Sequence, residues 1–370
     1  MKYLDLDPKP YEHEPYPSDE EMIAKDLFHS NIGNLYFSNA VIRSLLNTGN
    51  TLHKYTKETN LNDYDCNLLI QANTIRDGAA DVYEKYYTEM DNCPNPFIII
   101  GAGTDSWDGF DIYMRQDTID TIHKCFSRIL ERTASIGVRG YYTKRVLVEQ
   151  VGLPADRIDV IGCPSLRYFG KHLEKFPRKY KRFGKDLRIA VNYTSYCYHN
   201  DEAIYLYQIL KKYKNSYVSF TDLIEAEMLL NGTPLPIELR HDLLPTTPNH
   251  FIMQQNRAVF SPTQAGELEL FKDFDFSIGS RIHQAVISVL AGCPAMLIAH
   301  SVRVLEIAQH HHIPYITREE LITRQPPLWE LYYRACWGMR DFYKHYDEKL
   351  LEYTDFLQKN GLDVNPDFLL

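Results

Sequence analysis

Short apolar runs recur along the chain and predict buried strands. Nine runs qualify: residues 66–72, 96–103, 135–139, 158–162, 187–192, 258–260, 275–279, 295–299 and 313–316. Most are nearly continuous in apolar residues rather than alternating with polar ones. We therefore expect them in parallel sheets that are covered on both faces.

Amphipathic segments lie between these runs and predict helices. They span residues 36–46, 118–132, 142–151, 201–212, 263–272, 282–291 and 302–309. After Pro327 the pattern is helical to Asn360 and includes the aromatic-rich stretch "LWELYYRACWGMRDFYKHY". We expect this last helix to pack back across the rest of the molecule. Strands alternating with helices predict an α/β fold.

The chain of 370 residues is longer than a domain with a single hydrophobic core usually is, which predicts two domains. The expected organisation is an extended N-terminal arm (1–28), a Rossmann-like domain (29–170), a basic linker (171–186), a second Rossmann-like domain (187–325) and a C-terminal helical segment (326–370). The linker is placed where glycine, proline and a run of Lys and Arg replace apolar periodicity.

Composition and charge narrow the class of protein. The chain is 44% hydrophobic and 24% charged, and its net charge of −9 argues against nucleic acid as the main partner. No apolar run approaches the roughly 20 residues of a membrane helix, and the acidic start is unlike a signal peptide. Seven scattered cysteines without a C-x-x-C pair predict buried, reduced thiols. We expect a cytoplasmic protein without a membrane span.

The residues that directly follow the predicted strands favour an anionic ligand. In open α/β sheets, ligands bind beyond the carboxyl ends of the strands. Here these ends are residues 101–104, 139–141, 163–165, 192–194 and 280–283. They offer small residues, two arginines and one histidine, and no acidic residue stands clearly among them.

The turn after residues 275–279 carries the most chemistry. Ser280 is a good N-cap, so the helix is expected to begin at Arg281, where unpaired backbone N–H groups attract anions. Arg281 adds a fixed cation, and His283 can act as an acid or base near neutral pH. A plain capping or packing role for both side chains is the alternative that spacing alone leaves open.

Four stretches, in order, resemble the polysaccharide pyruvyl transferase family. They are "HSNIGNLYFSNAVIRSL" (29–45), "IIIGAGTDSWDG" (98–109), "SIGVRGYYTKRVLVEQVGLPADRIDVIGCPSL" (135–166) and "DFSIGSRIHQAVISVLAGCPAMLIAHSVRVLEIAQHHHIPYI" (275–316), which contains a Gly-x-Arg-x-His pattern. The resemblance covers roughly residues 29–317. It implies two facing Rossmann-like domains, as in GT-B proteins. It also implies transfer of pyruvate from phosphoenolpyruvate to sugar hydroxyls as a ketal, with no metal or other cofactor.

The resemblance also implies site residues by position. Arg281 and His283 match the catalytic Arg-x-His, with His283 as general acid and Arg281 and Arg139 as clamps for the donor's negative groups. The positions expected to bind substrate are Arg139, Arg303, Asn31, Gly33, Asn34, Gly101, Gly103 and Ser280. The chain departs from the family pattern at Asn34, where aspartate is common, and at Ala102, which interrupts a Gly-Gly pair.

Other interpretations stay open. The acceptor would be a cell-surface glycan or its lipid-linked or nucleotide-linked precursor. The fold also suits a glycosyltransferase that uses a nucleotide sugar, although such a pocket should offer a carboxylate to the ribose. A non-catalytic glycan-binding member is the third interpretation. The run His310-His311-His312 suggests a metal, but consecutive helical residues diverge by about 100°. We expect these histidines at a solvated helix end.

Overall fold

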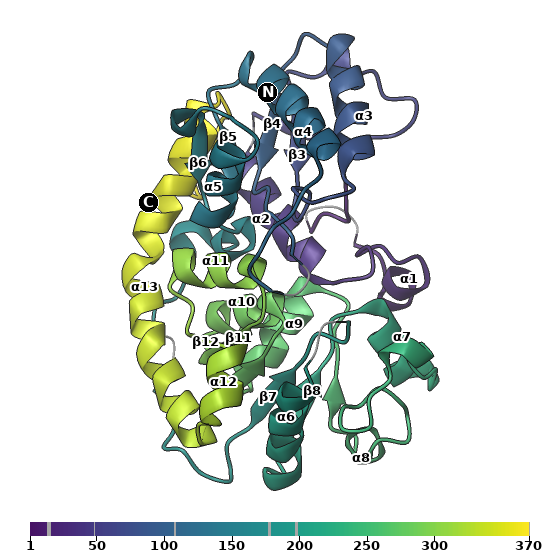
Figure 1. The fold of residues 1–370 in the computed structure, drawn as a ribbon, viewed down its shortest axis with the longest axis vertical. Helices are drawn as coiled ribbons and strands as arrows, with labels where there is room; N and C mark the ends of the chain where they lie inside the picture. The colour runs from purple at the N-terminus through teal and green to yellow at the C-terminus, as the bar shows by residue number, and fades with distance from the viewer. Residues whose placement is uncertain (13–15, 48, 107–108, 177–178, 197–198, 370) are drawn as a thin grey trace.

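The protein consists of two α/β domains placed one above the other, as the computed structural model in Figure 1 shows. The structure describes residues 1–12, 16–47, 49–106, 109–176, 179–196 and 199–369. All strand pairings in the described residues are parallel. The predicted fold class, two facing Rossmann-like domains in a GT-B-like arrangement, is confirmed.

The N-terminal domain contains a sheet of order β2-β1-β3-β4 and a pair β5-β6, linked by a bridge between Ala102 and Val138. Its strands are β1 Lys2–Asp5, β2 Thr51–Lys54, β3 Cys66–Ile70, β4 Phe97–Ile100, β5 Ile136–Val138 and β6 Ile158–Val160. Its helices are α1 Asp19–Ala24, α2 Gly33–Leu45, α3 Ala80–Asp91, α4 Gln116–Leu130 and α5 Tyr141–Glu149, with 3-10 turns at Leu61–Asp63, Ala155–Arg157, Pro164–Arg167 and Gly170–His172.

The C-terminal domain contains a sheet of order β12-β11-β10-β7-β8-β9. Its strands are β7 Ile189–Asn192, β8 Ser216–Ser219, β9 Ala258–Val259, β10 Phe276–Gly279, β11 Ala295–Ala299 and β12 Tyr315–Thr317. Its helices are α6 Asn200–Lys212, α7 Leu223–Asn231, α8 Phe251–Gln254, α9 Gln264–Lys272, α10 Ile282–Leu290, α11 Val302–His311 and α12 Arg318–Arg324, with a 3-10 turn at Ile237–Leu239. The strand order changes direction between β10 and β7, which puts their carboxyl ends at the place where such folds bind ligands.

The long helix α13, Leu328–Lys359, joins the two domains along one side of the molecule (Figure 1). In the C-terminal domain its Tyr332 packs in the core. At its other end, Phe356 lies so close to Gly137 of β5 that a Cβ there would come within 2.7 Å of the ring. The prediction that the C-terminal helix packs back on the domains is confirmed.

All nine predicted strands are present, but strands β1, β2 and β8 and helices α3, α7, α8 and α12 were not predicted, and helix α1 lies within the predicted extended arm. The predicted extended arm over residues 1–28 is wrong at its start, because β1 pairs with both β2 and β3 inside the sheet. Its four residues, "KYLD", are too few and too polar at their ends to show a pattern. Strand β2 shows none either, because its residues are exposed or half-buried.

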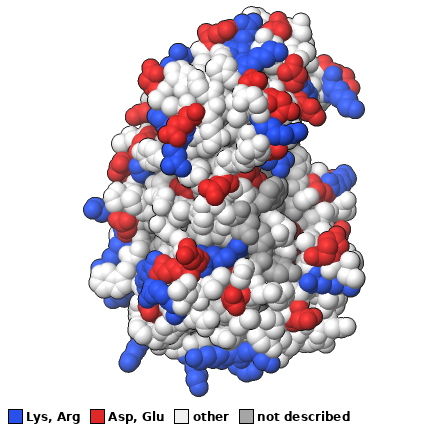
Figure 2. Space-filling model, viewed as in Figure 1, with Lys and Arg blue, Asp and Glu red and all other residues white. Residues whose placement is uncertain are grey.

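Figure 2 shows Lys, Arg, Asp and Glu side chains interspersed over the face it presents. Even the 32-residue helix α13 lacks the apolar character of a membrane span, as does every other helix in the described part of the chain. The six described cysteines are buried, as predicted, and no disulfide joins any two of them; Cys197 lies outside the described residues.

Candidate active site

One cavity of about 770 Å³ lies where the two domains meet. The C-terminal domain contributes the segments after β7, β8, β10 and β11, and the N-terminal domain contributes the segments after β3 and β4 and the start of α2. The lining residues are Ser30, Asn31, Asn34, Asn73, Asp105, Thr194, Tyr196, Thr221–Ile224, Ser280–His283 and His300, Ser301, Arg303 and Val304. The predicted residues His283, Arg281, Arg303, Asn31, Asn34 and Ser280 therefore line one cavity, whereas Arg139, Gly33, Gly101 and Gly103 do not.

The turn after β10 is shaped by its neighbour β7. Gly279 has a φ of +158°, and a Cβ there would come within 1.9 Å of the Asn192 carbonyl oxygen, so only glycine fits. Helix α10 begins at Ile282 with Arg281 as its N-cap residue, which corrects the prediction of a Ser280 cap. The Ser280 hydroxyl instead accepts a hydrogen bond from the Thr194 backbone N–H at 3.0 Å, and the Arg281 N–H donates to Asn192 Oδ1.

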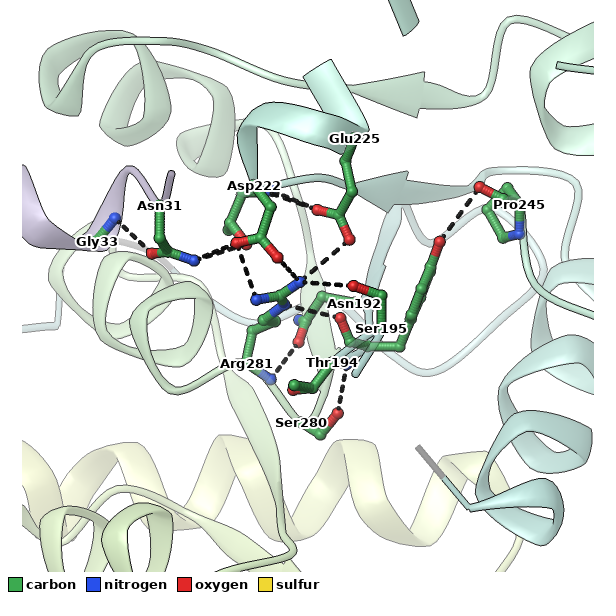
Figure 3. A network of polar contacts seen from close by, with 12 residues as sticks. Asn31, Gly33, Asn192, Thr194, Ser195, Asp222, Glu225, Pro245, Ser280 and Arg281 are labelled. Atoms are coloured by element: carbon green, nitrogen blue, oxygen red, sulfur yellow. Dashed lines mark hydrogen bonds and ion pairs between the residues drawn. The ribbon is translucent and has the colours of Figure 1, made fainter. Parts of the chain in front are cut away.

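The guanidinium of Arg281 is occupied by protein groups (Figure 3). Its Nη1 donates to Asp222 Oδ1 at 3.0 Å and its Nη2 to Glu225 Oε1 at 3.1 Å, while Nη2 also pairs with Asp222 Oδ2. Its Nε donates to the Tyr193 carbonyl at 2.8 Å. Burial alone would lower the pKa of Arg281, but the two carboxylates raise it above its usual value. The charge of Arg281 is thus balanced by protein carboxylates, and its role as a clamp for the donor stays a prediction.

Arg281 and its partners also connect the domains. Asn31 donates to Asp222 through its amide, and its backbone forms an antiparallel bridge with that residue. The Ile32 N–H donates to the Thr221 carbonyl at 3.1 Å, and the Leu223 N–H donates to the Ser30 carbonyl at 3.0 Å. The buried ion pair thus holds the loop after β8 in the position that meets the N-terminal domain.

His283 lies against the start of α2. A Cβ on Gly33 would come within 2.0 Å of the imidazole Nδ1, so Gly33 is required by close approach rather than by a turn. Tyr36 presents a T-shaped contact, with ring centroids 6.2 Å apart. His283 is only 7% exposed, and its Nε2 has no hydrogen-bond partner among the described residues. Burial lowers the pKa of His283 well below its usual range, and Arg303, Arg139 and Arg281 lower it further.

The turn after β11 brings a second basic pair to the cavity. His300 and Arg303 flank the start of α11, and both line the cavity. Arg303 was predicted from the sequence as a site residue, whereas His300 was not. Arg303 is half-buried, and no carboxylate of the described residues forms an ion pair with it. Its Nε is buried without a hydrogen-bond partner in the same part of the chain. Burial, helped by nearby arginines, lowers the pKa of His300 to about 3.

Arg139 lies behind the cavity wall rather than on it. Its side chain is fully buried, with Nε donating to the Gly101 carbonyl and Nη1 donating to Asn73 Oδ1, each at 3.0 Å. Asn73 lines the cavity, and Arg139 Nη2 is buried without a partner among the described residues. Gly103 makes room for it, because a Cβ would lie 2.9 Å from Arg139 Cδ. Burial lowers the pKa of Arg139.

The segment Asn31–Asn34 is a capping device for α2. Asn31 Oδ1 accepts from the Gly33 N–H at 2.9 Å, while Asn34 Nδ2 donates to the carbonyls of Phe28 and His29, each at 3.1 Å. His29 and Ser30 have positive φ values of 51° and 65°, so these bonds support an unusual loop. An aspartate at position 34 could not donate them, which explains the departure from the family pattern physically.

Gly101 and Ala102, which follow β4, are each suited to their position for a different physical reason. Gly101 has a φ of +80°, and a Cβ there would come within 2.7 Å of the Phe37 ring. Ala102 is fully buried, and its N–H donates to the Gly137 carbonyl at 3.1 Å, so a methyl group is accommodated where the pattern has glycine.

Two acidic residues at strand ends were missed. Asp105 follows β4 and Asp222 follows β8, and both line the cavity. The sequence-based argument against a nucleotide pocket, that no carboxylate follows a strand, is therefore wrong. Strand β8 was not predicted, so nothing marked Asp222 as a strand-end residue. Tyr196, 47% exposed and with Arg281 5.3 Å from its ring centroid, was also missed.

The histidine run at the end of α11 is not solvated, contrary to the prediction. His310 and His311 are 4% and 2% exposed, because they pack under Gly162, where a Cβ would come within 2.1 Å of His311 Nε2. His311 Nε2 accepts from the Cys163 N–H at 2.7 Å. His312 lies beside Asp341 and His345 on α13, and these three form a group with potential metal-ligand atoms within 4.8 Å of one another.

The cavity is suited to an anion. Helices α10 and α11 both begin on it, and the first N–H groups of a helix have no acceptor within the helix. Arg303 supplies a cation without a carboxylate partner among the described residues, and His283 supplies a titratable nitrogen. The cavity wall also carries amides, hydroxyls, Asp222 and Tyr196, which are groups that bind polyhydroxylated ligands through hydrogen bonds and ring stacking.

Distant solved structures share the general shape. Staphylococcus aureus MnaA in a co-structure with UDP covers 96% of this chain and 98% of its own, at 9% identity and a TM-score of 0.48. UDP-GlcNAc 2-epimerase from Neisseria meningitidis bound to UDP-GlcNAc covers 97% and 99%, at 9% identity and a TM-score of 0.42. A functionally uncharacterized Klebsiella pneumoniae protein covers 85% and 92%, at 9% identity and a TM-score of 0.45. Because these scores are low, the fold assignment rests on the chain's own sheets.

Sequence comparison gives the family. Among curated proteins, no sequence matches the chain. The pattern of the family described as polysaccharide pyruvyl transferase matches residues 4–302. These residues include most of both domains, the Arg-x-His turn and the residues that line the cavity, except Arg303 and Val304. That match extends over far more than half of the molecule, and the chain accordingly belongs to the polysaccharide pyruvyl transferase family.

Proposed function

We propose that this protein transfers pyruvate from phosphoenolpyruvate to two hydroxyl groups of a sugar, as a ketal. The observation that carries the proposal is the convergence on one cavity of two helix N-termini, the buried His283, and Arg303, which has no carboxylate partner among the described residues. Phosphoenolpyruvate bears a carboxylate and a phosphate, so its recognition requires two separate anion sites. The starts of α10 and α11 offer such a pair.

The roles of the arginines follow from their partners. Arg303 is proposed to bind the donor directly, because it is half-buried on the cavity and has no carboxylate partner in the described chain. Arg139 adds positive potential from behind Asn73, which lines the cavity and accepts a hydrogen bond from Arg139 Nη1. Arg281 fixes the loop after β8 and is a positioning residue.

The chemistry requires one proton donor. His283, as imidazolium, protonates the methylene carbon of the enol, and the neighbouring carbon becomes the electrophile that the first hydroxyl attacks. Phosphate then leaves, and the second hydroxyl closes the ketal. The two hydroxyl protons end on the methyl group, by way of His283, and on the departing hydrogen phosphate. Cations beside the phosphate stabilise its departure.

The rest of the cavity would hold the acceptor. A cavity of about 770 Å³ lies in the range of sites that bind drug-sized ligands, so it has room for a sugar beside a three-carbon donor. Asn31, Asn34 and Asp222 can hydrogen-bond to hydroxyls, and Tyr196 can stack on a sugar ring. We propose a glycan or its lipid- or nucleotide-linked precursor as acceptor.

A second candidate is a glycosyltransferase that uses a nucleotide sugar. The observation that favours it is the pair of carboxylates Asp105 and Asp222 after β4 and β8. Asp222 is already bound by Arg281 and Asn31, and Asp105 lines the cavity on the side of the N-terminal domain. Thermal shifts separate the two candidates, because a ligand that binds the native state raises the melting temperature. Stabilisation by phosphoenolpyruvate supports the first, and stabilisation by a nucleotide sugar alone supports the second.

The decisive test is product formation. The protein is incubated with phosphoenolpyruvate and a panel of glycans, and mass spectrometry detects the pyruvyl ketal while phosphate release is followed. His283→Ala should lower turnover by about 10²–10⁴-fold, the contribution of a positioned proton donor, while the protein still folds. His53→Ala on the distant edge strand β2 is the matched histidine control and should retain full activity. Ketal formation at the normal rate by His283→Ala would refute the assignment.

A further inference from the structure

The surroundings of His283 conflict with a resident general acid. Three guanidinium groups lower its affinity for a proton, those of Arg303, Arg139 and Arg281. Nε2 is buried without a partner in the described chain, so no carboxylate holds a proton on it. At neutral pH an imidazole in this position is uncharged while the cavity is empty.

The groups on each neighbouring element do not reverse this balance. On α10 itself, the charge of Arg281 is offset by Asp222 and Glu225. On the turn after β11, Arg303 is cationic and His300 is uncharged, since burial lowers the pKa of His300 to about 3. These two turns therefore present a net positive charge to the His283 ring.

The N-terminal domain and α9 add little negative charge. Helix α2 presents Gly33 and Tyr36, and behind Tyr36 lies Glu267 of α9, whose pKa burial raises to about 8. Glu267 is thus largely protonated at neutral pH. Beyond β5, Arg139 is fully buried with its cation facing Asn73, and Asp105 is the carboxylate of this domain on the cavity wall.

We infer that His283 is uncharged in the empty cavity and takes up its proton when phosphoenolpyruvate binds, so that the donor anion itself creates the general acid. The inference rests on the proposed function. A carboxylate and a phosphate dianion placed beside Arg303 turn the local charge from positive to negative, which favours the imidazolium. Proton uptake thereby couples donor binding to acid catalysis, and the enzyme carries no acid before its donor is seated.

Calorimetry measures this uptake directly. Phosphoenolpyruvate is titrated into the protein at about pH 8, without acceptor, in buffers of different ionisation enthalpy. At that pH the free donor is fully ionised, because the second pKa of a phosphate monoester is about 6. The slope of observed enthalpy against buffer ionisation enthalpy gives the protons taken up. We expect between about one half and one proton per donor for the native protein.

Two histidine variants assign the proton. His283→Gln keeps a polar side chain of similar length and should bind the donor with a slope near zero. His300→Gln is the matched control on the neighbouring turn and should keep the native slope. Equal slopes for the native protein and His283→Gln, or loss of uptake in His300→Gln, would overturn the inference and leave the donor assignment intact. If the native protein shows no heat of binding with phosphoenolpyruvate, the proposed function fails as well.

A third variant tests the cause. Arg303→Gln removes a cation that lowers the pKa of His283 and that has no carboxylate partner among the described residues. Burial still keeps the imidazole of the empty cavity uncharged at pH 8, while the imidazolium of the donor complex loses a repulsive neighbour. Proton uptake at saturating donor should therefore persist to a higher pH than in the native protein. Uptake that falls off at the same or a lower pH would mean that the arginine does not control the histidine, which contradicts the inference.

Discussion

The turns after β10 and β11 carry the same residue types and serve different purposes. Each follows a buried strand, contains a serine, and brings one arginine and one histidine to the cavity. Arg281 of the first turn is bound by two carboxylates, whereas Arg303 of the second has no carboxylate partner among the described residues. Arg281 holds the loop after β8 in place, and Arg303 is available to bind a ligand.

The difference comes from a third segment. Asp222 and Glu225 follow β8. In the sheet, β8 is separated from β10 by β7 alone, but from β11 by both β7 and β10. The two carboxylates therefore reach Arg281, after β10, and not Arg303, after β11. Glu225 also accepts the N–H groups of Thr221 and Asp222, and burial, opposed by Arg281, raises its pKa to about 7. The role of an arginine at a strand end thus depends on whether a neighbouring loop places a carboxylate beside it.

Removal of Arg281 should give the largest effect on stability. Arg281→Met leaves Asp222 and Glu225 buried without their cation, which costs about 3–5 kcal/mol when one partner of a buried pair is lost. The denaturation midpoint in urea measures this loss. Adding Asp222→Asn and Glu225→Gln should restore part of it, because the orphaned charges are then gone. A stable Arg281→Met protein that lacks only donor binding would restore Arg281 as a clamp.

Removal of Arg303 should show the reverse pattern. Arg303→Gln loses a hydrogen bond to a charged ligand, worth about 1.5–3 kcal/mol, so the donor Kd should rise roughly 10- to 150-fold. The free energy of unfolding should change by less than about 0.5 kcal/mol, since Arg303 forms no ion pair with the described residues. Isothermal titration and urea denaturation measure the two effects. Arg145→Gln, on α5 beside Tyr142, is the arginine control and should bind the donor normally.

The two turns illustrate what a sequence can reveal about a fold. Strand β10 has four residues, "FSIG", and strand β11 has five, "AMLIA", and all of them are buried. Both strands were predicted because burial on two faces gives a short run of mainly apolar residues. Strand β8, "SYVS", begins and ends with a buried serine, Ser216 and Ser219, so its buried positions do not appear as an apolar run. Its absence from the prediction also concealed Asp222 and Glu225.

The site was predictable in its location and not in its charge balance. His283, Arg303 and the Asn31 loop could be placed on one cavity because strand ends of facing sheets converge. The pairing of Arg281 depends on a contact across 59 residues, between loops whose distance no local pattern encodes. The buried state of His310 and His311 likewise depends on Gly162, which lies far away in sequence.

The close contact between Gly33 and His283 ties the first turn to the N-terminal domain. In Gly33→Ala, the new methyl group would lie 2.0 Å from His283 Nδ1, so ring or helix must move. Overpacking of this kind costs about 1–3 kcal/mol, and a displaced proton donor can lower turnover about 10²-fold. Urea denaturation and ketal formation measure the two losses.

The double variant is the control for this contact. In a His283→Ala background the obstacle is gone, so Gly33→Ala should cost little further stability. If the stability losses of the two substitutions instead add, the methyl group acts elsewhere and the contact between the turn and α2 is not the cause.

The smallest effect is expected at Asn34, which supports the loop that meets Asp222. Asn34→Asp removes the two hydrogen bonds to the carbonyls of Phe28 and His29 and places a carboxylate beside these oxygens, at a cost of about 1–2 kcal/mol. The folded state then disfavours the ionised form, which raises the pKa of the introduced group, so the penalty is present at neutral pH and shrinks as pH falls toward about 4. Urea midpoints of variant and native protein at two pH values measure the difference. A penalty independent of pH would mean that lost hydrogen bonds alone, and not carboxylate repulsion, destabilise the loop.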